Sequence, residues 1–172
     1  MAKHTLNDYD KSIINFYIRG TLSDLSKTFL LFLIFYFLNL HKELLCGVFF
    51  LMLFRVFSGG IHCSTYFSCF LLSFAVLSSG VFMGLNMFLS KGGMIPLCIL
   101  CSIIIICLSP VMSSSRPKLT SKELIITKIK LSIILMGFAL TIVFLDTNSY
   151  INIGFWILII HTAQLAVAYV RR

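Results

Sequence analysis

Charged side chains are scarce in this chain. Only 12% of its 172 residues are charged, and just six of them are acidic. A soluble domain of this length needs far more charge on its surface. The composition is instead 59% hydrophobic, with 17 phenylalanines and a mean hydropathy of +1.00. This scarcity of charge excludes an ordinary soluble globule and predicts a polytopic membrane protein whose surface is largely covered by lipid.

A cleavable signal peptide is also missing from the pattern. The first 21 residues contain no compact apolar stretch followed by a small-residue cleavage site, so we expect insertion through an internal span. The net charge of +8 comes from cations in loops and near the chain ends. Anionic lipid and the positive-inside rule explain this charge more simply than nucleic acid does, so no nucleic-acid partner is expected.

The six cysteines do not have the pattern of a disulfide framework. All of them lie within apolar runs except Cys63, which stands at the head of one. Buried free cysteine behaves as a small hydrophobe, and disulfide frameworks belong to small exported domains with loop cysteines. Cys98 and Cys101 form a C-x-x-C pair inside an apolar run without neighbouring histidines, which argues against metal or redox use. No metal or cofactor is expected.

Residues 1–21 have the pattern of a helix that lies on the membrane surface. Apolar and charged side chains alternate there so that one face is apolar and the other is charged. We expect Gly20 to end this helix, and residues 21–24 resemble a capping box that starts the next one. A transmembrane bundle over 22–172 follows, and the whole of 1–172 is expected to form a single integral-membrane domain.

The rest of the chain predicts an all-α fold with about six transmembrane helices. The expected spans are 22–40, 44–57, 64–89, 94–108, 131–145 and 150–170. Ser109-Pro110 should end the fourth span, and the capping box of Thr120 and Glu123 should open the fifth helix. Six spans put both termini on one side of the membrane, and the basic loop and Arg171-Arg172 fall on that same side. Because cations gather on the cytoplasmic side, we expect both termini in the cytoplasm.

The most polar stretch within the apolar part of the chain runs from Arg55 to Cys69. Within it, His62 and Cys69 have the chemistry of a cysteine-peptidase dyad, because a histidine can activate a thiol as nucleophile. A continuous helix would separate their Cα atoms by about 10.5 Å, which is too far for a hydrogen bond. Gly59 and Gly60 make the necessary bend feasible. The alternative is an interfacial histidine and an unrelated core cysteine.

Other polar residues each have two readings. Arg55 either holds a substrate carboxylate or an oxyanion, or marks a helix end as a snorkelling cation. Cys63 is less suited than Cys69, because neighbours along a helix do not face each other. His161 lies in the last span, where interhelical hydrogen bonding is favoured over a direct functional role. The basic stretch 116–130 is either a solvated or lipid-facing loop, or a grip for an acidic peptide.

At this point the chain resembles the accessory gene regulator B family, the membrane endopeptidases of Gram-positive peptide quorum sensing. The family pattern is an arginine, then a glycine pair or near-pair, a histidine, and a cysteine seven residues later. The matching residues are Arg55, Gly59, Gly60, His62 and Cys69. The family also has a proline-containing basic loop after the next two spans, where 109–110 and 116–118 stand here. Length and span count match, so the resemblance covers nearly the whole chain.

The resemblance implies an endopeptidase of the plasma membrane that cuts a small pro-peptide C-terminal to its signalling core. Cys69 attacks the scissile carbonyl with His62 as base, and an acyl-enzyme thioester forms. An internal cysteine or serine of the peptide then displaces the enzyme, which gives a thiolactone or lactone ring. By the same resemblance, Arg55, Gly59 and Gly60 support the site.

The resemblance further implies a pro-peptide that has an amphipathic leader and an acidic C-terminal tail, which the basic loop with Arg116 and Lys118 would bind. It also allows a homodimer. The residues do not name the peptide or show that it is cyclised. On the residues alone, a small transporter or channel-like module without catalysis stays open, in which Cys69 is dispensable and Arg55 and His161 matter.

Overall fold

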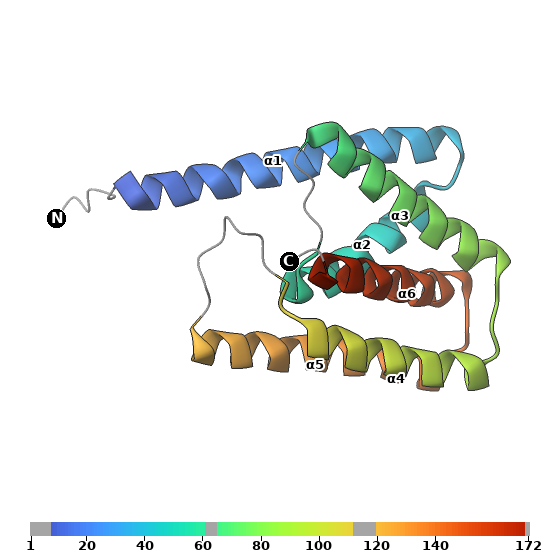
Figure 1. Cartoon of the computed structure of the whole chain (residues 1–172). Coiled ribbons are helices and arrows are strands. Elements are labelled where there is room, and N and C mark those ends of the chain that lie inside the picture. The colour runs from blue at the N-terminus through green and yellow to red at the C-terminus, as the bar shows by residue number, and fades with distance from the viewer. Residues whose placement is uncertain (1–7, 61–64, 112–119, 171–172) are drawn as a thin grey trace, which may run out of the picture. The chain divides into compact units, whose positions relative to one another are not determined.

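A computed structural model describes residues 8–60, 65–111 and 120–170, with the side chains of 8–17 and 19–21 outside the description. Over these ranges the fold is all-helical, apart from connecting segments and an isolated parallel bridge between Gly59 and Val111. The predicted all-α class is therefore confirmed. The helices are α1 (Asp8–Phe37), α2 (His41–Ser58), α3 (Tyr66–Asn86), α4 (Lys91–Leu108), α5 (Ser121–Phe144) and α6 (Ser149–Val170), as shown in Figure 1.

The chain divides into two compact units, Met1–Leu40 and His41–Arg172. The first unit contains α1, which has 30 residues and a length of about 45 Å. The prediction that Gly20 ends a helix is wrong, because α1 continues through it without interruption. A glycine inside a helix costs only about 1 kcal/mol relative to alanine, which a long helix on both sides of it can tolerate.

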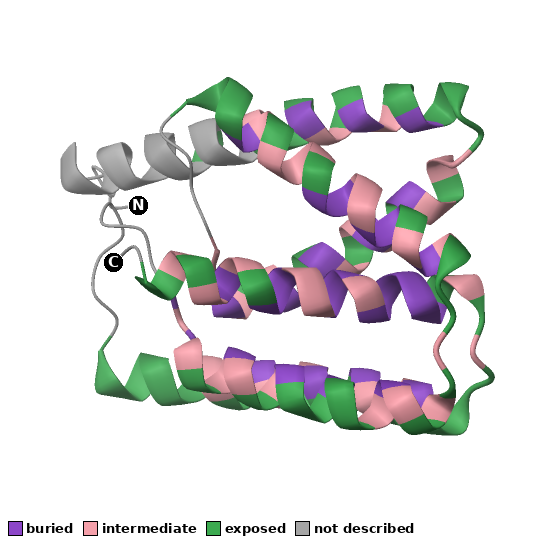
Figure 2. Ribbon diagram, turned by 45° about the vertical axis from the view of Figure 1, so that its right-hand side comes forward, coloured by how far each residue is buried: buried purple, intermediate pink, exposed green. Residues whose placement is uncertain are grey.

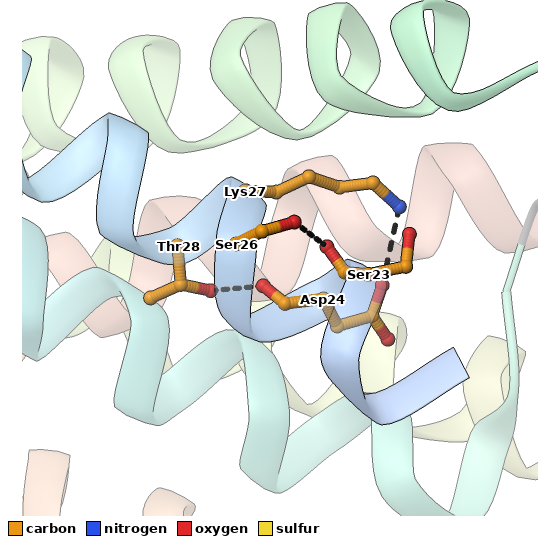
Figure 3. Close-up of polar contacts among 5 residues, drawn as sticks. All are labelled: Ser23, Asp24, Ser26, Lys27 and Thr28. Carbon is orange, nitrogen blue, oxygen red and sulfur yellow. Dashed lines mark hydrogen bonds and ion pairs between the residues drawn. The ribbon is translucent and has the colours of Figure 1, made fainter. Parts of the chain in front are cut away.

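The polar residues expected to start a new helix instead form contacts within α1. Lys27 Nζ lies 3.3 Å from Asp24 Oδ1, and the Thr28 hydroxyl donates to the Asp24 backbone oxygen at 2.9 Å (Figure 3). These are the spacings of neighbours on one helix face. Helix α1 then ends where Asn39 adopts a φ of 57°. The Leu40 amide donates to Phe35 O at 2.9 Å and the Asn39 amide to Tyr36 O at 3.0 Å, which is a Schellman cap.

In the second unit, α6 is the core helix. Helices α2, α3 and α4 pack against it, and α5 packs against α2 and α4. Buried residues follow one another without a gap from Ile151 to Phe155, so they occur on nearly all sides of its first half. Figure 2 shows buried residues in purple along the helices of this unit. Lipid alone can cover a helix that is apolar all round, so the central position of α6 comes from its contacts with the neighbouring helices. The buried residues of α6 are Ile151, Asn152, Ile153, Gly154, Phe155, Ile157, Leu158, His161, Thr162 and Leu165.

Small residues bring α3 unusually close to α6. A Cβ on Gly80 would collide with the Ile157 side chain, and one on Gly84 would collide with both the side chain and the backbone of Ile153. Glycines four residues apart on one face let two helix backbones approach in this way, as is common between membrane helices. Contacts of this kind replace the hydrophobic driving force, which is weak between helices in lipid.

Two predicted helix boundaries in the second unit are confirmed. Helix α4 ends at Leu108, directly before Ser109-Pro110. Helix α5 begins after Thr120, whose backbone amide and hydroxyl donate to Glu123 Oε2 at 2.8 and 2.7 Å. Helix α5 also starts about ten residues before the apolar span expected within it, so its first turns are polar.

Membrane crossing is supported for part of the predicted topology. Among the described residues, four helices are long and apolar enough to span a bilayer: α3, α4, α5 and α6. The protein is therefore a membrane protein of the all-α class. Helix α2 is as long as α4, but it carries Lys42, Glu43 and Arg55 and is not among the four. A total of six spans, an interfacial position of 1–21 and cytoplasmic termini stay predictions.

Candidate functional site

The glycine pair ends α2, as predicted. Helix α2 stops at Ser58, and Gly59 follows with a φ of 82°, which side-chain-bearing residues rarely adopt. The Gly59 amide donates to Arg55 O at 3.0 Å, and the Val111 amide donates to Ser58 O at 2.9 Å. A Cβ on Gly59 would lie only 2.0 Å from Val111 O. Both the backbone angle and the close approach therefore require glycine at this position.

Gly60 is required for a different reason from Gly59, namely its contact with the Arg55 side chain. Its φ is not positive, but a Cβ there would lie 2.8 Å from Arg55 Nε. The guanidinium of Arg55 thus passes directly over Gly60, and any side chain at 60 would displace it. The structure therefore brings together two of the residues predicted to support the site.

Cys69 lies in the first turn of α3. The preceding Thr65 caps this helix, since its hydroxyl oxygen accepts from the Ser68 amide at 3.3 Å and its carbonyl accepts from the Cys69 amide at 3.2 Å. The Thr65 and Ser68 hydroxyl oxygens are also 2.7 Å apart. Cys69 itself is a free thiol with 8% of its surface exposed. The nucleophile candidate thus stands at a capped helix start, close in sequence to the end of α2.

Several predicted site residues lie outside the described ranges. His62 falls in 61–64, between Gly60 and Thr65, together with Cys63. Arg116 and Lys118 fall in 112–119, after Val111. The expected contact of His62 with Cys69 and the grip of the basic loop on a peptide stay predictions.

His161 forms the interhelical hydrogen bond that its place in the last span suggested. Its Nε2 lies 2.7 Å from Ser58 Oγ, and both residues have no exposed surface. This contact joins the last residue of α2 to the middle of α6, across 103 positions of sequence. Ser58 was not predicted as a site residue. The signal for it was a hydroxyl directly before the helix-breaking glycines, combined with a single histidine inside the last span.

The C-x-x-C pair occupies a different environment from Cys69. Cys98 and Cys101 lie in the middle of α4, are 1% and 7% exposed, and are free thiols. The described part of the chain holds no group of three or more His, Cys, Asp or Glu residues placed to bind a metal ion. These two cysteines serve as small residues in the packing of α4.

The fold and the site define a class of protein. It is an integral-membrane helical bundle with a cysteine in the first turn of one helix, shortly after a glycine pair that ends the preceding helix. The sequence profile of the family described as Accessory gene regulator B matches residues 1–165, so the chain belongs to that family. Membership implies a role in processing the autoinducing peptides of quorum sensing. Comparisons with curated proteins and with solved structures gave no match. The predicted family is thus confirmed over nearly the whole chain.

Proposed function

We propose that this chain is a membrane-embedded cysteine endopeptidase that cleaves a quorum-sensing pro-peptide C-terminal to its signal core. The observation that carries the proposal is the break between α2 and α3. Helix α2 ends at Ser58 and α3 begins at Tyr66, which places Cys69 in a first helical turn rather than in a helix middle. The free backbone amides of a helix N-terminus favour bound negative groups beside it.

In the proposed reaction the Cys69 sulfur attacks the scissile carbonyl carbon while the His62 imidazole accepts the thiol proton. The resulting tetrahedral intermediate collapses as the C–N bond breaks, and His62 returns the proton to the leaving amine. The products are a thioester acyl-enzyme and the released C-terminal tail. A cysteine thiol or serine hydroxyl within the peptide then attacks the thioester carbonyl, which frees the Cys69 thiol and closes a thiolactone or lactone ring.

The described residues support two further parts of this scheme. Arg55 is held over Gly60, close in sequence to His62, where a cation can stabilise an oxyanion or a substrate carboxylate. Gly59 fixes the point at which the chain leaves α2. Exclusion of water protects the thioester from hydrolysis until the ring closes, and a site within a membrane bundle favours this.

The proposal extends to the partners of the enzyme. Its substrate has an amphipathic leader, which binds the bilayer surface, and an acidic tail, which the cations of the basic loop, Arg116 and Lys118 among them, attract. The protein acts in the plasma membrane with both termini in the cytoplasm, without a cofactor and without nucleic acid.

The test is co-expression of the chain with a precursor peptide encoded beside its gene, followed by mass analysis of the peptide products. Cys69→Ala should abolish cleavage, and His62→Ala should lower its rate by about 10²- to 10⁴-fold. A variant with Cys98→Ala and Cys101→Ala is the matched control and should cleave normally. Continued cleavage by Cys69→Ala would reject the peptidase. A transporter or channel-like module without catalysis predicts instead that no variant cleaves the precursor, that Cys69 is dispensable, and that function is lost on changing Arg55 or His161.

A further inference from the structure

The contact of Ser58 with His161 is a buried polar link between α2 and the core helix α6. Ser58 Oγ lies 2.7 Å from His161 Nε2, 2.7 Å from the Phe54 carbonyl oxygen and 3.4 Å from the Gly59 carbonyl oxygen. Ser58 and His161 are both 0% exposed. Neither residue belongs to the predicted dyad or to the basic loop.

Counting hydrogens assigns the direction of this bond. A serine hydroxyl carries one hydrogen, and a carbonyl oxygen can only accept. The 2.7 Å contact with Phe54 O therefore requires Ser58 to donate there. Its lone pair then accepts from His161, so the imidazole carries its hydrogen on Nε2. The His161 Nε2–H group of α6 thus donates to the Ser58 hydroxyl at the end of α2.

The other nitrogen of this imidazole leaves the histidine only half satisfied, as Asn152 also is in the same helix. His161 Nδ1 is buried and has no hydrogen-bond partner among the described residues. A buried polar group that is only half satisfied stabilises a core less than an apolar residue of similar size. The contribution of His161 therefore lies in what its Nε2–H group holds in place.

The Nε2–H group of His161 fixes the last residue of α2, Ser58. The Ser58 side chain is bound by His161 and its carbonyl by the Val111 amide at 2.9 Å, while the next residue, Gly59, lies against Val111. The end of α2 is therefore fixed from two sides, by α6 and by the segment after α4. His62 follows Ser58 by four positions in the sequence, so the fixed end of α2 comes shortly before the residue proposed as the base.

We propose that His161 is a positioning residue of the peptidase, which acts through Ser58 to orient the segment that carries His62. This inference rests on the proposed function. A misplacement of about 1 Å remote from the chemistry can lower a rate by about 100-fold. The hydrogen bond between the two side chains can therefore control turnover although neither touches the substrate.

Three variants separate positioning from packing. His161→Leu and Ser58→Ala each remove one partner of the bond, whereas His161→Gln keeps an N–H donor at a similar reach and should rescue it. Thr162→Val is the matched control, because it also removes a buried hydroxyl from α6, but one that donates within its own helix to Leu158 O at 2.7 Å. The double variant Ser58→Ala with His161→Leu completes a cycle, whose non-additivity measures the coupling.

The first readout is the rate of precursor cleavage, measured against precursor concentration in the co-expressed or vesicle-reconstituted full chain. We expect His161→Leu and Ser58→Ala each to lower the maximal rate by about 10- to 100-fold, without a change in the half-saturating concentration. The double variant should be no slower than the slower single variant. His161→Gln should retain most of the rate, and Thr162→Val should cleave like the wild type.

The second readout does not depend on cleavage. Hydrogen exchange of the Gly59 and Val111 amides should accelerate by about two- to tenfold in His161→Leu, the factor expected for one lost hydrogen bond. Unchanged hydrogen exchange in His161→Leu overturns the inference. Faster exchange with an unchanged maximal rate of cleavage also overturns it, because the bond would then be structural only. Cleavage by the wild type that persists in Cys69→Ala rejects the peptidase instead, and the positioning role of His161 with it.

Discussion

The two halves of α6 use polar side chains in different ways. In the first half, Asn152 donates to the backbone oxygens of Gly84 and Met87 at 2.8 and 2.9 Å, and the Trp156 indole donates to Met87 O at 3.0 Å. These donors satisfy the carbonyls that the end of α3 leaves free. In the second half, His161 meets not a backbone oxygen but a side chain, Ser58. Each half leaves one buried side-chain atom without a partner among the described residues, Asn152 Oδ1 in the first and His161 Nδ1 in the second.

This difference separates a scaffold from a site. The first half of α6 joins α3 by close glycine contacts and by side chains that complete backbone hydrogen bonds, and both features stabilise the bundle. The second half stands beside the end of α2, where Gly59 has a positive φ and the chain leaves the helix toward His62. We therefore expect changes in the first half to affect stability, and changes near the second half to affect turnover.

Gly59→Ala should have the largest effect of the substitutions that probe this division. An alanine would have to adopt a φ of 82° with its Cβ 2.0 Å from Val111 O, so the end of α2 must move. We expect cleavage of the precursor to fall by about 100-fold or more, since the segment with His62 is displaced. The assay is the same co-expression, with the amount of membrane-inserted protein determined in parallel.

Gly137→Ala is the control for this substitution. Gly137 lies within α5 with nothing within 4 Å of a built Cβ, so alanine there should leave cleavage unchanged and stabilise the helix by about 0.5–1 kcal/mol. Normal cleavage by Gly59→Ala would show that the geometry of the α2 end does not govern the site.

Gly84→Ala should have a smaller effect, and one of a different kind. The new methyl group would meet the backbone and side chain of Ile153, and α3 must separate from α6 to admit it. Overpacking of this kind costs about 1–3 kcal/mol of folding free energy. Thermal unfolding in detergent should show the loss, whereas cleavage per folded molecule should stay normal. A large loss of turnover in the folded protein would contradict the scaffold assignment of this half.

Local features of the fold could be read from the sequence. The Thr120 and Glu123 capping box and the break at Gly59 each depend on a few neighbouring residues, and both were predicted correctly. The start of α4 was placed at Met94, but the helix begins at Lys91 and includes two glycines. The first turn of a helix has free amides in any case, so glycines there cost little.

Long-range features could not be read in this way. The hydrogen bond of Ser58 to His161 joins residues 103 positions apart, and no pattern in either segment predicts its partner in the other. Gly20 was misjudged because its effect depends on the helix around it, and α1 continues on both sides. The motif of His62 and Cys69 identified the family because its spacing is a sequence property. The contact between α6 and the end of α2 depends on how the helices pack in three dimensions, which no local pattern encodes.

The smallest predicted effect concerns Trp156 in the first half of α6. Trp156→Phe removes the indole N–H group but keeps an aromatic ring, and Met87 O still accepts from Asn152 at 2.9 Å. Because the carbonyl keeps one partner, the loss should be only about 0.5–1.5 kcal/mol of folding free energy. A modest decrease in the unfolding temperature with unchanged cleavage is the expected result. If the same substitution slowed turnover as strongly as His161→Leu, the two halves of α6 would not be functionally distinct, and the site would depend on the whole helix.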